Sequence, residues 1–223
     1  MTQHKLEWHA VSGGSDLPAG SARAVTLQGQ DIAIWRGASG AVQAWRNQCP
    51  HRGMRLSFGQ VRGERLSCRY HGWQFDETGH CAFMPAHRES TPPASIRVPS
   101  YGSMEAAGLI WVNLEGGEGS AFESGAAFGS HDLFCKSIYV ASALEPLACR
   151  LRTALPNGEQ LSHSLLRVAA SQEEGPPDDL VIALQDMTDD RCGLHLVACS
   201  SGAEETDRQT RLAVARWARR LRT

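Results

Sequence analysis

Two short segments of the sequence each carry a cysteine, a histidine and a glycine in close order. The first reads CPHRG and places Cys49 two residues before His51, and the second reads CRYHGW and places Cys68 three residues before His71. Each segment therefore offers one thiolate and one imidazole. A cluster of two chemically different irons uses such a set, because one iron can take both sulfurs and the other both ring nitrogens. This pattern predicts two loops that meet around one cofactor.

The glycines that follow, Gly53 and Gly72, agree with this interpretation. Without a Cβ atom, the backbone at these positions can turn tightly and aim its N–H groups at bridging sulfides. Two alternatives remain open. The four side chains could be two buried thiols and two hydrogen-bonded histidines. They could also bind zinc, although a Cys2His2 zinc site usually keeps its cysteines on one arm and its histidines on the other.

The chain has seven cysteines, an odd number, and we expect it to lack an export signal, so a disulfide framework is not expected. Cysteines outside the two segments have no partner at ligand spacing. We expect most of them to be small core residues: Cys81, Cys135, Cys149, Cys192 and Cys199.

The charge argues against polyanionic partners. The chain has 223 residues and a formal net charge of −2, which provides no long-range attraction for nucleic acid or anionic lipid. Its first residues, MTQHKLEWHA, lack an apolar stretch of signal-peptide length, and no later segment is apolar over the length of a transmembrane helix. We therefore expect a cytoplasmic protein that binds neither nucleic acid nor membranes.

Residues 1–116 have the pattern of one antiparallel all-β unit. Short β-type runs alternate with glycine-containing turns, as in hairpins. The predicted strands are Ala24–Leu27, Asp31–Arg36, Ala41–Arg46, Gln60–Val61, Arg65–Cys68 and Leu109–Leu114. Residues 117–130 are rich in glycine, serine and alanine, which is typical of a linker or an exposed loop.

Residues 131–223 predict a small α+β domain with a helix over a sheet. The β-type runs there are Ser137–Ser142, Leu161–Ala169, Leu180–Gln185 and Leu194–Cys199. A helix is predicted over Glu204–Arg222, where apolar side chains recur at i, i+3, i+4 and i+7: Val214, Trp217, Ala218 and Leu221. Arginines surround this stripe, and they indicate either a solvated face or a docking face for an acidic redox protein.

Residues Asp16–Gly116 resemble the Rieske domain of ring-hydroxylating and demethylating non-haem iron oxygenases. The segments DLPAG, DIAIWRG, CPHRG, LSFGQV, CRYHGWQFDETGHC and GLIWVNLEG carry the resemblance. It implies an antiparallel β-sandwich and a [2Fe–2S] cluster on four ligands: Cys49, His51, Cys68 and His71. Respiratory Rieske proteins have a further disulfide between the two loops, whereas Met54 and Tyr70 stand at those positions here. The resemblance therefore implies the oxygenase or ferredoxin type, with Trp73 packed beneath the cluster.

In that family a larger catalytic domain follows and holds one mononuclear Fe(II) on two histidines and a carboxylate. Here residues 131–223 are shorter and offer three separated histidines: His131, His163 and His195. The segment NGEQLSH, residues 157–163, is the nearest counterpart of the ligand motif, but no second histidine follows it. We expect these histidines to lie at the surface or in hydrogen bonds. Binding of a mononuclear Fe(II) by residues 131–223 is therefore doubtful.

Three aspartates could supply a carboxylate ligand or could simply form a hairpin turn: Asp186, Asp189 and Asp190. The tail of the chain weakly resembles the end of the family's catalytic domain. We therefore interpret residues 131–223 as a shortened remnant that has lost its iron.

These features predict an oxidoreductase component: a Rieske electron-transfer protein or subunit of a non-haem iron oxygenase system for aromatic ring hydroxylation or demethylation. Its expected partners are a flavin/iron–sulfur reductase and a catalytic oxygenase subunit, and we expect an oligomer. Two alternatives stay open. The chain could be a self-contained oxygenase with a divergent mononuclear iron site, or a non-catalytic redox-sensing or assembly subunit.

Overall fold

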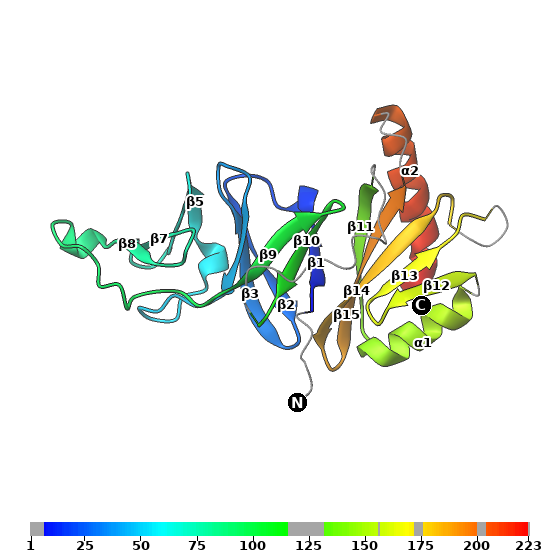
Figure 1. Ribbon diagram of the computed structural model, residues 1–223, viewed down its shortest axis with the longest axis horizontal. Coiled ribbons are helices and arrows are strands. Elements are labelled where there is room, and N and C mark those ends of the chain that lie inside the picture. The colour runs from blue at the N-terminus through cyan, green and yellow to red at the C-terminus, as the bar shows by residue number, and fades with distance from the viewer. Residues whose placement is uncertain (1–6, 116–131, 156, 172–175, 200–203, 223) are drawn as a thin grey trace.

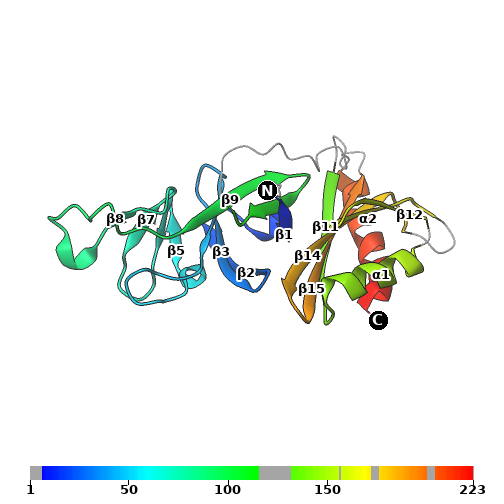
Figure 2. The same cartoon turned by 60° about the horizontal axis from the view of Figure 1, so that its bottom comes forward.

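The computed structural model describes residues 7–115, 132–155, 157–171, 176–199 and 204–222. Within these ranges the strands form three antiparallel sheets (Figure 1). A four-stranded sheet lies at one end, a five-stranded sheet with two helices lies at the other, and a six-stranded sheet lies between them. Figure 2 shows the same succession from a second direction.

The six-stranded sheet has the order β1-β10-β9-β4-β3-β2. Its strands are β1 (His9–Gly13), β2 (Ser21–Leu27), β3 (Gln30–Arg36), β4 (Val42–Arg46), β9 (Ser100–Ala106) and β10 (Leu109–Asn113). The β2–β3 hairpin turns at Gln28 and Gly29, whose φ angles are +48° and +74°. Positive φ at both central residues matches the right-handed twist of the strands, which explains why a glycine occupies this turn.

The four-stranded sheet has the order β5-β6-β7-β8, with β5 (Gln60–Arg62), β6 (Arg65–Ser67), β7 (Gln74–Asp76) and β8 (Cys81–Phe83). Three 3-10 turns accompany the two sheets: Gly14–Asp16, Leu56–Phe58 and Pro85–His87. Trp35 and Trp45 form the centre of the core beside this sheet, with their rings edge to face at 4.9 Å. Cys49 and Cys68 belong to the same buried cluster, so this core supports both Cys/His loops from below.

The five-stranded sheet has the order β11-β15-β14-β13-β12. Its elements are β11 (Asp132–Val140), β12 (Gly158–Ser162), β13 (Leu165–Val168), β14 (Leu180–Thr188) and β15 (Arg191–Cys199), with α1 (Leu144–Ala154), α2 (Glu204–Trp217) and a closing 3-10 turn (Ala218–Arg222). Both helices cover one face of the sheet, since Leu147 of α1 and Val214 of α2 pack in one core with Ile182 and Leu184 of β14.

The other face of this sheet packs against β1 and β10. Val181 and Ala183 alternate with the helix-facing residues of β14 and join a core with Ala10 and Trp111. A strand with both faces buried reads as a continuous apolar run, which accounts for the sequence LVIAL. Backbone hydrogen bonds add to this interface, because Gln28 N donates to the Asp186 carbonyl at 2.8 Å and Gly29 N to the Met187 carbonyl at 2.7 Å.

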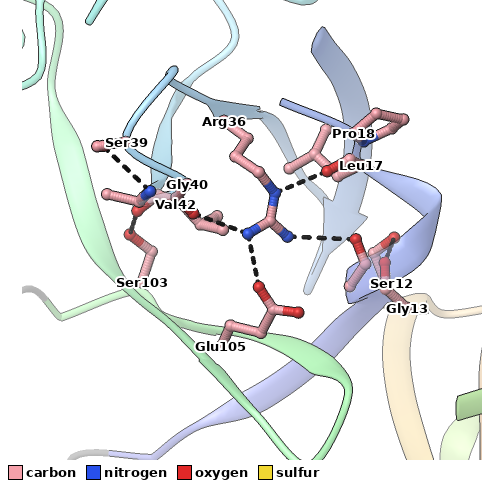
Figure 3. A network of polar contacts seen from close by, with 12 residues as sticks. Ser12, Gly13, Leu17, Pro18, Arg36, Ser39, Gly40, Val42, Ser103 and Glu105 are labelled. Atoms are coloured by element: carbon pink, nitrogen blue, oxygen red, sulfur yellow. Dashed lines mark hydrogen bonds and ion pairs between the residues drawn. The ribbon is translucent and has the colours of Figure 1, made fainter. Parts of the chain in front are cut away.

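Arg36 ties the strands of the six-stranded sheet to the turn after β1 (Figure 3). Its side chain is 12% exposed, and Nη1 forms an ion pair with Glu105 at 2.6 Å. Nε donates to the Leu17 carbonyl at 2.7 Å, and Nη1 also donates to the Gly40 carbonyl at 2.8 Å. One guanidinium therefore satisfies loop carbonyls from two segments, as its fork of donors allows.

The predicted fold class is confirmed: an antiparallel β-sandwich precedes a smaller sheet covered by helices. Every strand predicted in residues 1–116 overlaps an observed strand, but β1, β7, β8 and β9 were not predicted. The predicted boundary loop, residues 117–130, lies outside the described residues. Among the described helices, neither α1 nor α2 is long and apolar enough to cross a membrane.

Three details of residues 131–223 differ from the sequence prediction. The run Leu161–Ala169 is a hairpin rather than one strand, because Ser162 Oγ accepts a hydrogen bond from Ser164 N at 3.3 Å and forms a turn. Helix α1 was not predicted, although LEPLACRL carries apolar residues at helical spacing. The closing helix is α-helical only to Trp217, and its last residues tighten into a 3-10 turn.

Candidate metal centre

The two Cys/His segments form loops with the same hydrogen-bonding pattern. Each cysteine N–H donates to the carbonyl five residues on, at 2.8 Å in both loops, and each cysteine carbonyl accepts from the glycine N–H four residues on, at 2.8 and 3.0 Å. The pairs are Cys49–Met54 and Gly53–Cys49 in the first loop, and Cys68–Trp73 and Gly72–Cys68 in the second. The two segments, with their different spacings C-x-H and C-x-x-H, thus form loops with the same backbone hydrogen bonds.

The backbone conformation of each loop requires a glycine at its turn. Gly53 has φ +73° and Gly72 has φ +71°, a region that other residues rarely adopt. At Gly72 a Cβ atom would also lie 3.0 Å from Cγ of Pro85. The tight turns predicted at the two glycines are therefore present, and the N–H groups of Gly53 and Gly72 close these turns onto the cysteine carbonyls.

The two thiols lie together at the base of the loops. Cys49 and Cys68 are each 3% exposed, and the Cys68 side chain is within hydrogen-bonding reach of Cys49. Burial raises the pKa of the Cys49 thiol to about 12, although the His51 backbone N–H lowers it. A coordinated metal ion deprotonates such a thiol, so metal binding here would release protons.

The two imidazoles lie on the outer side of the thiols. The rings of His51 and His71 are 4.5 Å apart at their centroids. Burial lowers the pKa of His51, and the nearby His71 and Arg52 lower it further. The Nδ1 atom of His51 is buried, and among the described residues it has no hydrogen-bond partner. A buried nitrogen without a partner is costly unless it binds a ligand or metal.

Aromatic rings hold both histidines in place. Trp73 stacks on His51 with a centroid distance of 4.3 Å and an interplanar angle of 3°. The resemblance implied that Trp73 packs beneath the cluster, and the structure shows its ring stacked on that of His51. Tyr70 lies over His71 at 3.9 Å and is 56% exposed. The contact between Tyr70 and His71 was not predicted, because nothing in the sequence indicates that these two neighbouring rings would pack together.

A polar network fixes the first loop at both ends; its Asn47 and Ser57 are buried, whereas its Asp31 and Arg55 are half-exposed. Asn47 Nδ2 donates to Asp31 Oδ1 at 2.9 Å and to Ser57 Oγ at 3.0 Å, while Asn47 Oδ1 accepts from Ser57 N at 2.8 Å. Arg55 Nη2 adds a bond to the same Asp31 oxygen at 2.7 Å. These supporting residues were also missed, because partners so far apart in sequence carry no local signal.

The arrangement fits a [2Fe–2S] cluster with mixed ligands. It offers two adjacent buried sulfurs, two adjacent imidazoles, one buried nitrogen available for a metal, and a tight glycine turn in each loop. A Cys2His2 zinc site would require neither this division of sulfur and nitrogen between both arms nor the paired glycine turns.

The structure does not gather the other candidate ligands at one site. His131 lies outside the described residues. His163 lies in the turn between β12 and β13, and His195 lies in the middle of β15. Asp189 and Asp190 form the β14–β15 turn, where Asp190 accepts a hydrogen bond from Thr188 at 2.7 Å, in keeping with the hairpin interpretation.

His195 is fully buried, and both its ring nitrogens are in hydrogen bonds. Its Nε2 lies 3.0 Å from Gln185 Oε1 and its Nδ1 lies 2.8 Å from Ser137 Oγ. Since Gln185 Nε2 donates to the Thr26 carbonyl at 2.7 Å, Gln185 Oε1 is an acceptor and His195 Nε2 carries the proton. Nδ1 then accepts from Ser137, which leaves no lone pair for a metal.

We expect His195 to make folding stability depend on pH. Burial, together with the positive charge of Arg23, lowers its pKa from 6.5 to about 4. Between pH 6.5 and pH 4 the histidine is therefore protonated in the unfolded chain and neutral in the folded chain. The free energy of unfolding falls as the pH drops over this range, by about 3 kcal/mol. Urea unfolding at pH 7 and pH 4.5 should show this loss reduced in His195→Gln and retained in the exposed-site control His87→Gln. Equal losses in both variants would contradict the assignment.

Comparison with known proteins agrees with this geometry. Residues 7–102 match the model of the Rieske [2Fe-2S] domain family. A relative in Pseudomonas putida, oxidoreductase NdmD, is 46% identical over 109 residues, which are 48% of this chain and 18% of that protein. The 5,5'-dehydrodivanillate O-demethylase oxygenase subunit of Sphingobium is 32% identical over 111 residues, 48% of this chain and 26% of its own length. The chain thus spans about a quarter or less of these relatives.

Similar solved structures extend the likeness to both parts of the chain. NdmA from Pseudomonas putida CBB5, in a mutant form with theobromine, superposes with a TM-score of 0.70 and 19% identity, over 96% of this chain and 80% of that chain. Dicamba monooxygenase superposes with a TM-score of 0.68 and 19% identity, over 96% and 87%. At such identity the comparison establishes a shared fold, which includes the sheet formed by residues 132–199.

Proposed function

The chain carries a Rieske [2Fe–2S] domain, and from this premise we propose that it transfers single electrons within a non-haem iron oxygenase system. The proposal rests on the two matching loops, which bring a buried cysteine pair and an outward histidine pair to one place. The names of its relatives, an oxidoreductase and an oxygenase subunit, support a role in an oxygenase system that hydroxylates or demethylates its substrate.

We assign the ligands as Cys49 and Cys68 for one iron and His51 and His71 for the other. When bound, the cluster accepts and releases one electron at a time. Cys49 and Cys68 exclude water from the inner side, because each is 3% exposed. His71 is exposed, so the chain offers its partner an imidazole edge at the surface.

The partner should dock on the face formed by Tyr70, His71 and the arginines beside them. Arg52 follows His51, Arg69 precedes Tyr70, and both arginines are exposed. Positive charge around an exit point favours a partner with an acidic face. Helix α2 carries exposed arginines too, but it lies at the opposite end of the molecule from β7 and β8 (Figure 1), which favours the loop face.

On this basis the partners are a flavin/iron–sulfur reductase that supplies electrons and an oxygenase subunit that consumes them. The described cysteines are free thiols, which suits a reducing compartment, and we place the protein in the cytoplasm. In this role the chain is an oxidoreductase component, and the oxygen-activating iron belongs to its partner.

The charge of Arg69 tests this docking face. We expect Arg69→Glu to slow reduction by an NADH-linked flavin/iron–sulfur reductase about 10-fold at low ionic strength, because steering by charge raises association rates. Stopped-flow bleaching of the oxidised cluster measures the rate. The control is Arg216→Glu on α2, which should leave the rate unchanged. If Arg216→Glu slowed the reduction of the cluster and Arg69→Glu did not, the docking face would instead be on α2.

The alternative of a self-contained oxygenase is less well supported, because both ring nitrogens of His195 are in hydrogen bonds. We expect the reduced protein alone, with added Fe(II), to hydroxylate or demethylate no aromatic or N-methyl substrate in a single turnover. Product formation that is lost in His163→Ala would instead establish an iron site in this chain. A sensing or assembly subunit would differ again, since it need not be reduced at turnover speed.

A further inference from the structure

Three potential metal ligands meet at the seam between the six-stranded and five-stranded sheets. They are Glu7, two residues before β1, His9 at the start of β1, and His163 in the β12–β13 turn. Their ligand atoms all lie within 4.8 Å of one another. His9 and His163 are far apart in sequence, so only the packing of β1 against β14 brings them together.

The distances suit one metal ion. Glu7 Oε1 lies 3.1 Å from His163 Nδ1, and Glu7 Oε2 lies 3.7 Å from His9 Nε2. A zinc ion bound at about 2.0–2.2 Å to nitrogen and oxygen needs ligands about 3.0–3.5 Å apart. The Glu7–His163 distance falls in this range. The Glu7–His9 distance of 3.7 Å and the His9–His163 distance, which is within 4.8 Å, must shorten, and rotation of the half-exposed Glu7 and His163 side chains allows this.

The surroundings also suit a metal with open coordination positions. The His9 side chain is 7% exposed, whereas Glu7 is 51% exposed, so the site has a fixed inner ligand and an outer side facing water.

We propose that Glu7, His9 and His163 form a binding site for a divalent first-row cation of the zinc type. Two imidazoles and one carboxylate are donors that such cations, Zn²⁺ and Fe²⁺ among them, prefer, whereas Mg²⁺ prefers oxygen ligands alone. The site is separate from the Cys/His loops, and two of its ligands precede or begin the first strand of the Rieske domain. A cation held there would join that strand to the β12–β13 turn of the second sheet.

Zinc titration of the cluster-loaded protein tests the proposal. Equilibrium dialysis with metal analysis should find one Zn²⁺ per chain and no Mg²⁺ bound under the same conditions. Zn²⁺ at about 100 times its Kd should also raise the Tm by roughly 5 °C or more. X-ray absorption at the zinc edge should show nitrogen and oxygen neighbours only, since zinc at the cluster cysteines would show sulfur near 2.3 Å.

Variants locate the site. His163→Ala and Glu7→Gln change half-exposed side chains and should each weaken zinc binding at least about 10-fold, because even supporting residues around a metal contribute 10–100-fold. The control His87→Ala removes an exposed histidine from another surface and should bind zinc normally. Sulfur around the bound zinc, or unchanged affinity in His163→Ala and Glu7→Gln, would overturn the proposal and leave an ordinary His163–Glu7 ion pair.

Discussion

Cys68→Ser is expected to purify without its cluster, retaining less than roughly a tenth of the wild-type iron and acid-labile sulfide. Cys68 is 3% exposed and starts the second loop, so no other described thiol can replace it without moving the loop. A serine hydroxyl is a poor substitute, since iron–sulfur clusters are held by thiolates. Visible absorption and chemical sulfide analysis of the purified protein measure the loss.

Cys81→Ser is the matched control. Cys81 is 6% exposed in the same core as Cys68, and its thiol lies 3.7 Å from the Phe83 carbonyl. A serine there keeps a hydrogen-bonding group in β8 and should retain the full cluster. Full iron and sulfide in Cys68→Ser would contradict the ligand assignment, whereas loss in both variants would indicate damage to the shared core.

His71→Cys is expected to keep a cluster but to lower its reduction potential by on the order of 100 mV or more, because clusters with four cysteine ligands lie well below Rieske centres. The thiolate adds negative charge where a neutral imidazole stood, and this stabilises the oxidised state. The exposed position of His71 should let the loop accept the change. A redox titration followed by EPR gives the potential.

The control for this change is Tyr70→Phe, which keeps a ring over His71 and removes only the hydroxyl. Its potential should stay close to that of the wild type, because the ligand set is unchanged. An unaltered potential in His71→Cys would show that His71 does not bind the cluster.

The sequence predicted the proposed cluster ligands because their signal is local. Each loop carries its cysteine, histidine and glycine within five residues, and the structure brings the two loops together as expected. The support around the loops could not be predicted in this way. The Asn47 side chain bonds to Asp31 and to Ser57. These residues come together only when β3, β4 and the first loop have packed.

The second half of the chain shows the same limit. Helix α1 carried a periodic signal in Leu144, Leu147 and Leu151 that could have been found, whereas the split of Leu161–Ala169 depended on one serine turn. The nearness of His163 to Glu7 and His9 had no signal at all, because it follows from the packing of two sheets. Side chains that meet across such a seam have to be read from the structure.

The most direct test of the proposed electron carrier is EPR and electron–nuclear double resonance of the dithionite-reduced protein. We expect a red-brown protein, two acid-labile sulfides per cluster, and a mixed-valence [2Fe–2S] signal with hyperfine coupling to two imidazole nitrogens. His71→Cys should lose one of the two nitrogen couplings. A colourless protein that holds one zinc ion after anaerobic iron–sulfide reconstitution, and gives no such signal, would contradict the account.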